Sequence, residues 1–240
     1  MASNSPRYEY TPLYAGDAIR VLNLQPASTY ADELHVRLEM ARFPSAAGRF
    51  DEQCLTPYEA VSYTWGEATF SYQLHCEGQI IEVTKNVDLL LRRLRKPSGP
   101  RILWIDSVCI NQQDTKEKTF QIAMMDQIYS RASKVHVWLG EAAPSDRMQW
   151  VFDLFREIAR SDRDEGKSMD WVVNKTDLWD TALPDAVDCF LSRPWFGRRW
   201  ILQEVILGLD ITLPERHLIT IFGNIGIHEQ SAKSVAKIAL

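Results

Sequence analysis

The segment Arg101–Gly140 constrains the fold more than any other stretch of the chain. It opens with a nearly continuous apolar run, Ile102–Ile110, that is broken by Asp106. A run of this length, rich in Ile, Val and Trp, predicts a strand buried on both faces. A polar loop, Asn111–Lys118, and apolar residues at helical spacing follow, and Val135–Leu139 predicts a second strand.

This order of strand, loop, helix and strand is typical of a βαβ unit with parallel strands. In open sheets of that kind, ligands bind beyond the carboxyl ends of the strands. We therefore expect a site around Asp106, Ser107, Cys109 and Asn111, which follow the first strand of the unit.

The residues before this unit predict strands and one helix. Alternating apolar and polar residues in Ala18–Leu24 and Glu33–Ala41 predict an antiparallel pair at a sheet edge. The segment Tyr58–Gly66 predicts a strand, and Glu77–Gly78 predicts the turn of a hairpin. Asn86 is expected to cap a helix that follows. The buried stripe predicted for this helix is Val87, Leu90, Leu91 and Leu94.

The residues after the unit predict mainly helices. Met148–Phe155, Thr181–Leu191 and Phe196–Leu207 have helical patterns, and Leu218–Phe222 predicts a strand. A last helix is expected from His228 onward.

Composition excludes several classes of protein. The 240 residues include 27 Lys and Arg and 32 Asp and Glu, so the net charge of -5 disfavours binding of nucleic acid. The four cysteines form no CxxC pair, which disfavours a zinc site or a disulfide framework and favours a reducing cytoplasm. No segment has the roughly 20 apolar residues that a membrane span needs.

Three polar side chains have two interpretations each from spacing alone. Glu204 follows Trp200 by four positions on a predicted helix, where a surface glutamate paired with a nearby arginine is favoured over a pocket acid. Asp106 either fixes its loop or faces a ligand, and neither interpretation is favoured. Cys109 has no histidine nearby in the sequence, so a small buried cysteine is favoured over a nucleophile.

Three blocks together resemble the fungal HET domain, the heterokaryon-incompatibility module. They are YEAVSYTWGE (Tyr58–Glu67), the block Leu103–Gly140 that begins LWIDSVCINQQ, and RPWFGRRWILQE (Arg193–Glu204). The resemblance covers residues 8–225. It implies a cytoplasmic effector of regulated cell death in nonself recognition.

HET domains are in turn similar to TIR domains, which have a flavodoxin-like parallel sheet and many of which hydrolyse NAD. This resemblance implies an α/β fold with a mainly parallel sheet flanked by helices, Glu204 as the catalytic acid and NAD as substrate rather than cofactor, with no metal. The substrate-binding residues that it implies are Ser62, Tyr63, Trp65, Gly66, Asp106, Cys109, Asn111 and Trp200.

The residue pattern and this resemblance together predict a domain organisation. We expect a disordered N-terminus (1–7), extra antiparallel edge strands before a TIR-like core (58–210), a helical insertion within it (141–193), and a C-terminal helix (226–240) that begins a truncated downstream region. Self-association on activation and a protein partner that triggers it are also implied. The rival is a non-catalytic, self-associating signalling module.

Overall fold

In the computed structural model, nine strands form one mixed sheet in the order β5-β4-β2-β1-β6-β3-β7-β8-β9. The structure describes residues 5–13, 18–43, 57–161, 182–198, 218–223 and 226–230. Its strands are β1 (Ala18–Leu24), β2 (Leu34–Arg42), β3 (Glu59–Tyr63), β4 (Phe70–Cys76), β5 (Gln79–Thr84), β6 (Arg101–Trp104), β7 (Lys134–Trp138), β8 (Leu218–Gly223) and β9 (Gly226–Gln230). Its α-helices are α1 (Lys85–Leu94), α2 (Asp106–Cys109), α3 (Thr115–Ala123), α4 (Met125–Arg131), α5 (Met148–Ser161) and α7 (Ala182–Leu191).

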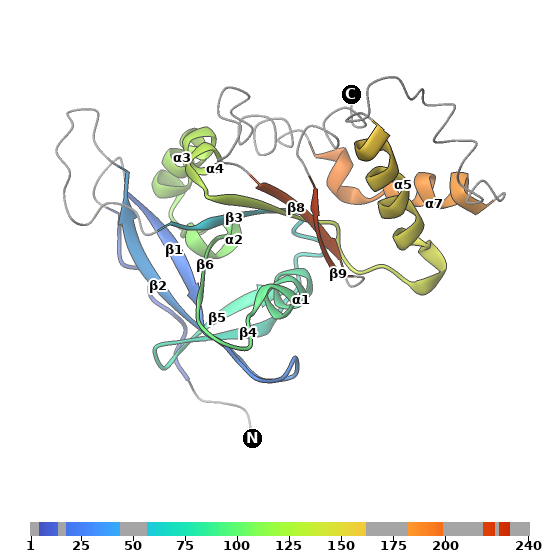
Figure 1. The fold of residues 1–240 in the computed structure, drawn as a ribbon. Helices are drawn as coiled ribbons and strands as arrows, with labels where there is room; N and C mark the ends of the chain where they lie inside the picture. The colour runs from blue at the N-terminus through green and yellow to red at the C-terminus, as the bar shows by residue number, and fades with distance from the viewer. Residues whose placement is uncertain are drawn as a thin grey trace.

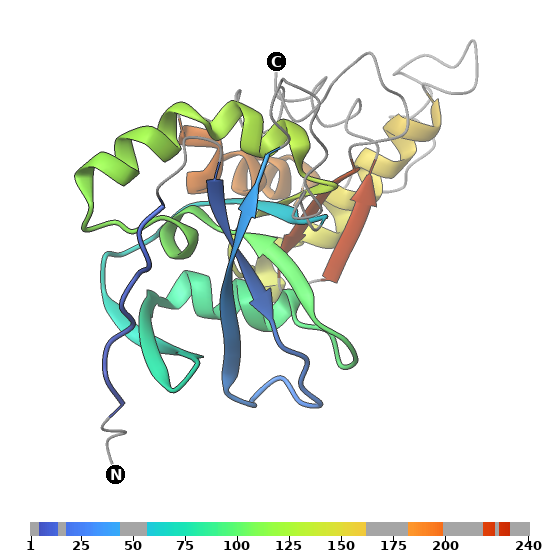
Figure 2. The ribbon, with the colours of Figure 1, turned by 90° about the vertical axis from the view of Figure 1, so that its left-hand side faces the viewer.

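The parallel core of the sheet confirms the predicted α/β class. Strand β3 pairs in parallel with β6 on one side and β7 on the other, and β7 pairs in parallel with β8. Helices α3 and α4 connect β6 to β7 and cover one face, and α1 covers the other (Figures 1 and 2). The βαβ unit is therefore present, with β3 lying between its two strands.

The antiparallel pairing of β1 with β2 is confirmed, but their predicted place at the sheet edge is wrong. Strand β1 pairs with β6, and β2 pairs in parallel with β4, so both are interior strands. The alternation in β1 predicted one solvent-exposed face because Arg20 lies among its apolar residues. Arg20 is only 3% exposed, since its charge is paired inside the protein.

The hairpin of β4 and β5 is confirmed together with its turn. Glu77 has φ 52° and Gly78 has φ 82°. Two successive residues with positive φ form the turn whose twist matches that of the paired strands.

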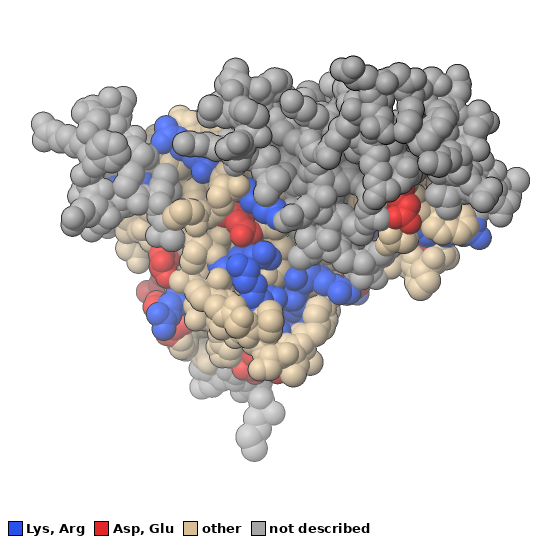
Figure 3. All heavy atoms as spheres, in the orientation of Figure 1, with Lys and Arg blue, Asp and Glu red and all other residues tan. Residues whose placement is uncertain are grey.

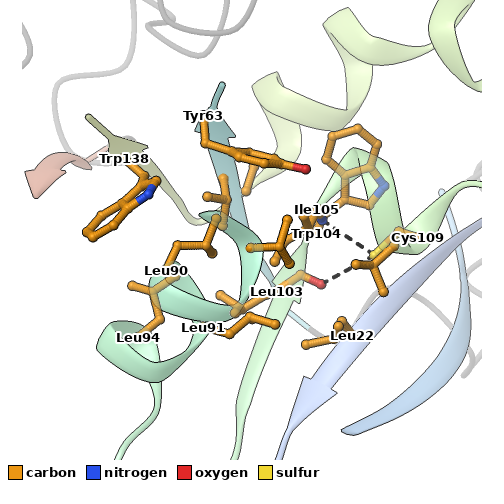
Figure 4. Close-up of a cluster of buried hydrophobic side chains, with 14 of the residues drawn as sticks. Leu22, Tyr63, Leu90, Leu91, Leu94, Leu103, Trp104, Ile105, Cys109 and Trp138 are labelled. Atoms are coloured by element: carbon orange, nitrogen blue, oxygen red, sulfur yellow. Dashed lines mark hydrogen bonds between the residues drawn. The ribbon is translucent and has the colours of Figure 1, made fainter. Parts of the chain in front are cut away.

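Helix α1 buries the predicted stripe, but Asn86 does not cap it. Leu90, Leu91 and Leu94 are at most 1% exposed and belong to the cluster of buried side chains that also contains Leu22 and Leu103 (Figure 4). Each side chain buried in this way contributes about 1.5–3 kcal/mol.

Asn86 instead joins two strand ends. Its side chain donates to the carbonyl of Thr64 and accepts from Trp138 Nε1 at 2.6 Å, while Thr84 stands at the N-cap.

The cations in the last turns of α1 hold the loop between β1 and β2. Arg92 donates to the carbonyls of Tyr30 and Asp32, and Arg95 donates to that of Glu33 at 2.7 Å. Figure 3 shows Lys and Arg side chains gathered on this face of the molecule. Part of this positive charge is therefore committed to packing a loop.

The apolar run that was predicted as one strand is a strand followed by a helical turn. Strand β6 ends at Trp104, and Asp106–Cys109 forms α2. The polar loop is shorter than predicted because α3 already begins at Thr115. The amides of Val108 and Cys109 both donate to the carbonyl of Ile105. Periodicity does not separate these cases, since a short apolar run suits either structure.

The later part of the chain agrees with prediction except near its end. Helices α5 and α7 and strand β8 are confirmed. Of the predicted helix Phe196–Leu207, the described part is the end of a 3-10 turn, Pro194–Gly197. The helix expected from His228 is wrong for the described residues there, because Gly226–Gln230 is a strand paired antiparallel with β8. No helix among the described residues is long and apolar enough to cross a membrane.

A buried ion pair joins β1 to α3. The guanidinium of Arg20 meets both carboxylate oxygens of Glu117, at 2.5 and 2.9 Å, and both side chains are at most 6% exposed. Arg20 also donates to the carbonyls of Cys109 and Thr11, and Glu117 accepts from the amide of Asn111 at 2.7 Å. These bonds satisfy charges that would otherwise be costly to bury.

Replacing Glu117 by Gln should destabilise the protein by about 3–5 kcal/mol, because it leaves the Arg20 charge buried without its counter-charge. Urea unfolding followed by fluorescence measures the loss. The control is Glu82→Gln, whose partner Arg7 stands 4.0 Å away on the surface, and whose cost should be about 0–1 kcal/mol. Equal costs in the two variants would contradict the structural role of the buried pair.

Candidate functional site

Polar side chains from the first two sequence blocks meet at the carboxyl ends of β3 and β6. Tyr63, the last residue of β3, donates its hydroxyl to Ser107 Oγ. Trp65 Nε1 donates to Asp106 Oδ2 at 2.9 Å, and the amide of Ser107 donates to Asp106 Oδ1. The helical turn α2 carries Asp106 and Ser107 and brings both side chains over the end of β3. The predicted site residues of both blocks are thus neighbours.

The third block reaches the same place from far along the chain. Trp195 Nε1 donates to Ser62 Oγ at 2.8 Å, and Arg198 donates to the same oxygen at 3.3 Å. Arg193 anchors this segment by donating to the carbonyl of Glu141 and to Asp146, 2.6 Å away. All three blocks therefore converge on the ends of β3, β6 and β7.

Burial raises the pKa of the two central groups, Tyr63 and Asp106. Burial raises the pKa of Tyr63 well above its ordinary value, and the nearby Asp106 carboxyl raises it further. Tyr63 is therefore a hydrogen-bond donor at neutral pH. Burial also raises the pKa of Asp106, although hydrogen bonds from Trp65 and Tyr63 and the charge of Arg198 oppose the shift.

A cleft of about 560 Å³ opens beside this cluster. Its volume lies within the range of small-molecule sites. Predicted site residues Trp65 and Asn111 line it, together with Ser107 from α2. The other lining residues are Arg7, Tyr8, Glu9, Tyr10, Phe70, Ile80, Ile81, Glu82, Gln112 and Gln113.

The N-terminal segment forms a wall of this cleft that sequence reasoning missed. The amide of Tyr8 donates to the carbonyl of Ile80 at the β5 edge, and the amide of Ile80 donates to the carbonyl of Pro6. Tyr10 Oη donates to the carbonyl of Val108 at 3.0 Å. Figure 2 shows the segment running along α2 and the β4–β5 hairpin. The available signal was the pair of aromatic residues, Tyr8 and Tyr10, spaced as on one face of a strand.

Cys109 belongs to the core and not to the lining of the cleft. It is fully buried, and its sulfur lies 3.4 Å from the amide of Ile105 (Figure 4). Burial raises the pKa of its thiol to about 12. This placement agrees with the interpretation as a small buried cysteine that the sequence favoured.

Two further predicted residues have structural settings of their own. Ser62 is fully buried beneath Trp195. Gly66 has φ +73°, and a Cβ placed there would lie 3.7 Å from that of Asn86, so backbone conformation rather than lack of space favours glycine. Trp200 and Glu204 lie outside the described residues, two and six positions after Arg198.

Cys109 should resist alkylation in the folded protein, because a thiol with a pKa of about 12 has a thiolate fraction of only ~10⁻⁴ at pH 8. Iodoacetamide labelling with peptide mapping measures this, and Cys189, which is partly exposed, serves as the internal reference. In urea the two cysteines should react alike. Rapid native labelling of Cys109 would restore the nucleophile hypothesis.

Replacing Ser62 by Ala should cost about 1–3 kcal/mol of stability, because the buried Trp195 N–H loses an acceptor. Denaturant unfolding in a double-mutant cycle with Trp195→Phe isolates the pair. In the Trp195→Phe background, Ser62→Ala should cost less. An identical cost in both backgrounds would show that the two side chains are not coupled.

Comparison with known proteins shows which family the chain resembles. The family model "Heterokaryon incompatibility protein (HET)" matches residues 58–204, which contain all three blocks. The chain is 31% identical over 229 residues to "Heterokaryon incompatibility protein 6, OR allele" of Neurospora crassa, covering 80% of this chain and 32% of that protein. It is 24% identical over 155 residues to "Vegetative incompatibility protein HET-E-1" of Podospora anserina, covering 63% of this chain and 9% of that protein.

The chain thus spans a third or less of the length of these curated relatives. No solved structure matches it. Because the family model covers more than half of the chain and the three blocks that it contains meet at one site, the chain belongs to the heterokaryon-incompatibility (HET) family.

Proposed function

We propose that this chain acts in fungal nonself recognition as an effector of regulated cell death. Family membership supports this role, as do the names of two relatives that are called incompatibility proteins. Within that role, the proposed activity is cleavage of NAD at the bond between nicotinamide and ribose, with Glu204 as the catalytic acid.

The observation that carries the enzymatic proposal is the convergence of the three blocks at one end of the parallel core. Arg198 is held against Ser62 at the end of β3, and Glu204 follows six residues later in the chain. Six residues span at most roughly 20 Å. A segment of this length is enough for Glu204 to reach the strand ends, as the proposal requires.

The chemistry suits a carboxylate. When the nicotinamide–ribose bond breaks, its electron pair leaves with the nicotinamide nitrogen, and the sugar develops oxocarbenium character. A nearby carboxylate stabilises that positive charge, as in glycoside hydrolysis. Water, or the adenine of the same molecule, then adds to the sugar carbon, so linear and cyclic ADP-ribose are both products of this route.

The cleft has the character that a dinucleotide needs. Trp65 and Phe70 offer aromatic surface to a planar heterocycle. The amide side chains of Asn111, Gln112 and Gln113 offer donors and acceptors to ribose hydroxyls. In this proposal Trp200 packs the pocket wall near the nicotinamide.

A non-catalytic, self-associating module is the second candidate, and one observation favours it. Ser62 accepts a hydrogen bond from Trp195, and Asp106 accepts one from Trp65. The polar groups at the strand ends therefore also hold parts of the protein together. In this alternative, Glu204 pairs with Arg198 or Arg199.

Measurement of NAD consumption separates the two candidates. The Glu204→Gln variant should lose activity by at least about 100-fold, the size of effect expected when a transition-state charge loses its partner. The matched control is Glu67→Gln, an exposed acid in the first block, which should retain wild-type turnover. Melting curves of all three proteins establish that each is folded.

The wild-type protein is assayed both dilute and at high concentration, because self-association can complete a site. Equal turnover in the wild type and Glu204→Gln would contradict the catalytic assignment. So would the absence of NAD consumption by the folded, assembled wild type, which would leave the self-associating module.

A further inference from the structure

The charged side chains that line the cleft are mostly acidic. One cation, Arg7, faces two carboxylates, Glu9 and Glu82. Arg7 Nη2 lies 4.0 Å from Glu82 Oε2, and these two side chains are 68% and 46% exposed. An ion pair at that distance and exposure is weak. The lining of the cleft therefore keeps a net negative charge.

Aromatic side chains share the lining with these acids. They are Tyr8, Tyr10, Trp65 and Phe70. Tyr8 and Tyr10 come from the N-terminal segment and meet edge to face, with ring centroids 5.1 Å apart and planes inclined by 89°. Phe70, the first residue of β4, is 46% exposed. The cleft thus offers aromatic surface and anionic oxygens in one place.

Hydrogen bonds hold two of these rings in place. Trp65 Nε1 donates to Asp106 Oδ2 at 2.9 Å, and Tyr10 Oη donates to the carbonyl of Val108 at 3.0 Å. The guanidinium of Arg20 also lies over the Tyr10 ring, 5.0 Å from its centroid. A ring that is fixed before binding loses little conformational freedom when a ligand arrives. Part of the aromatic lining is therefore preorganised, and one of its rings already contacts a cation of the protein itself.

We propose that this cleft binds a flat organic cation. The face of an aromatic ring carries negative electrostatic potential and attracts cations, and the indole of tryptophan does so most strongly. The same rings stack on flat heterocycles. Glu9 and Glu82 add two full negative charges to this surface. Together these groups select a ligand that is both planar and positively charged, which is the character of a pyridinium ring.

The nicotinamide ring of oxidised NAD is such a ring, so the inference names the part of the substrate that the cleft takes, and in this respect it rests on the proposed function. The phosphates of NAD are anionic and are repelled by the same carboxylates, so they lie outside the part of the cleft that Glu9 and Glu82 line. When the bond to ribose breaks, its electron pair moves to the ring nitrogen and the ring becomes neutral. The acidic lining therefore holds the released nicotinamide less tightly than it holds the ring of the substrate.

A pair of ligands, 1-methylnicotinamide and nicotinamide, separates the effect of charge from that of shape. They share the ring and its amide, but only 1-methylnicotinamide carries a positive charge. Titration of the folded chain with each ligand, followed by ligand-observed NMR, should show that 1-methylnicotinamide binds about fivefold or more tightly than nicotinamide. Sodium chloride at about 0.5 M should reduce this preference, because salt screens exposed carboxylates.

Two variants locate the binding site. Glu82→Gln should weaken the binding of 1-methylnicotinamide by about threefold or more and leave that of nicotinamide unchanged, whereas Phe70→Leu should weaken both. The matched control is Glu39→Gln, which removes an exposed acid on β2 that is not among the lining residues of the cleft. Phe70 and the side chain of Glu82 are each 46% exposed, and melting curves of the variants show that each is folded.

The cation site is overturned if the folded wild type does not bind 1-methylnicotinamide, if it binds both ligands equally, or if Glu82→Gln binds them as Glu39→Gln does. The assay of NAD consumption gives a separate result. Selective binding of 1-methylnicotinamide by a protein that consumes no NAD supports the cation site and counts against the proposed function. Consumption of NAD without selective binding overturns the cation site and leaves the proposed function intact.

Discussion

The buried pair of Arg20 and Glu117 is the interaction on which the arrangement of the site depends. A charged pair inside a protein is stable only when its remaining donors and acceptors find partners. Here those partners are the carbonyls of Cys109 and Thr11 and the amide of Asn111. The demand for partners therefore joins an interior strand, the end of α2, the loop before α3 and the N-terminal segment into one unit. That unit supplies one side of the cleft.

The cluster at the strand ends depends on hydrogen bonds that cross large sequence separations. Trp195 reaches Ser62 over 133 positions, and Trp65 reaches Asp106 over 41. Each bond joins a strand end to an element that follows another strand, so the site exists only when the parallel core is assembled. The central polar groups are also largely buried, which raises the pKa of Asp106 and Tyr63 and strengthens hydrogen bonds between them and their partners.

The sequence predicted those features that depend on local pattern, and it failed where a distant partner decides. The β4–β5 hairpin and the buried stripe of α1 follow from turn chemistry and helical spacing, and both are confirmed. The prediction that β1 has a solvent-exposed face was wrong, because the counter-charge of Arg20 lies 97 positions away. Asn86 looked like a cap because caps are local, whereas its side chain bonds Thr64 and Trp138. The wall formed by Tyr8 and Tyr10 could not be predicted from local pattern, because it depends on the β5 edge, which is distant in sequence.

These internal hydrogen bonds also limit where chemistry can occur. Ser62, Tyr63 and Asp106 all bond other parts of the protein, so they hold the scaffold in shape and are poorly placed to attack a substrate. Cys109 is excluded from that role by burial and by a pKa of about 12. The groups that line the cleft include the amides of the Asn111 loop, the aromatic rings of Trp65 and Phe70, and the carboxylates of Glu9 and Glu82. The acid that the proposed reaction uses comes from a different part of the chain, the third block, where it lies six residues beyond Arg198 in the sequence.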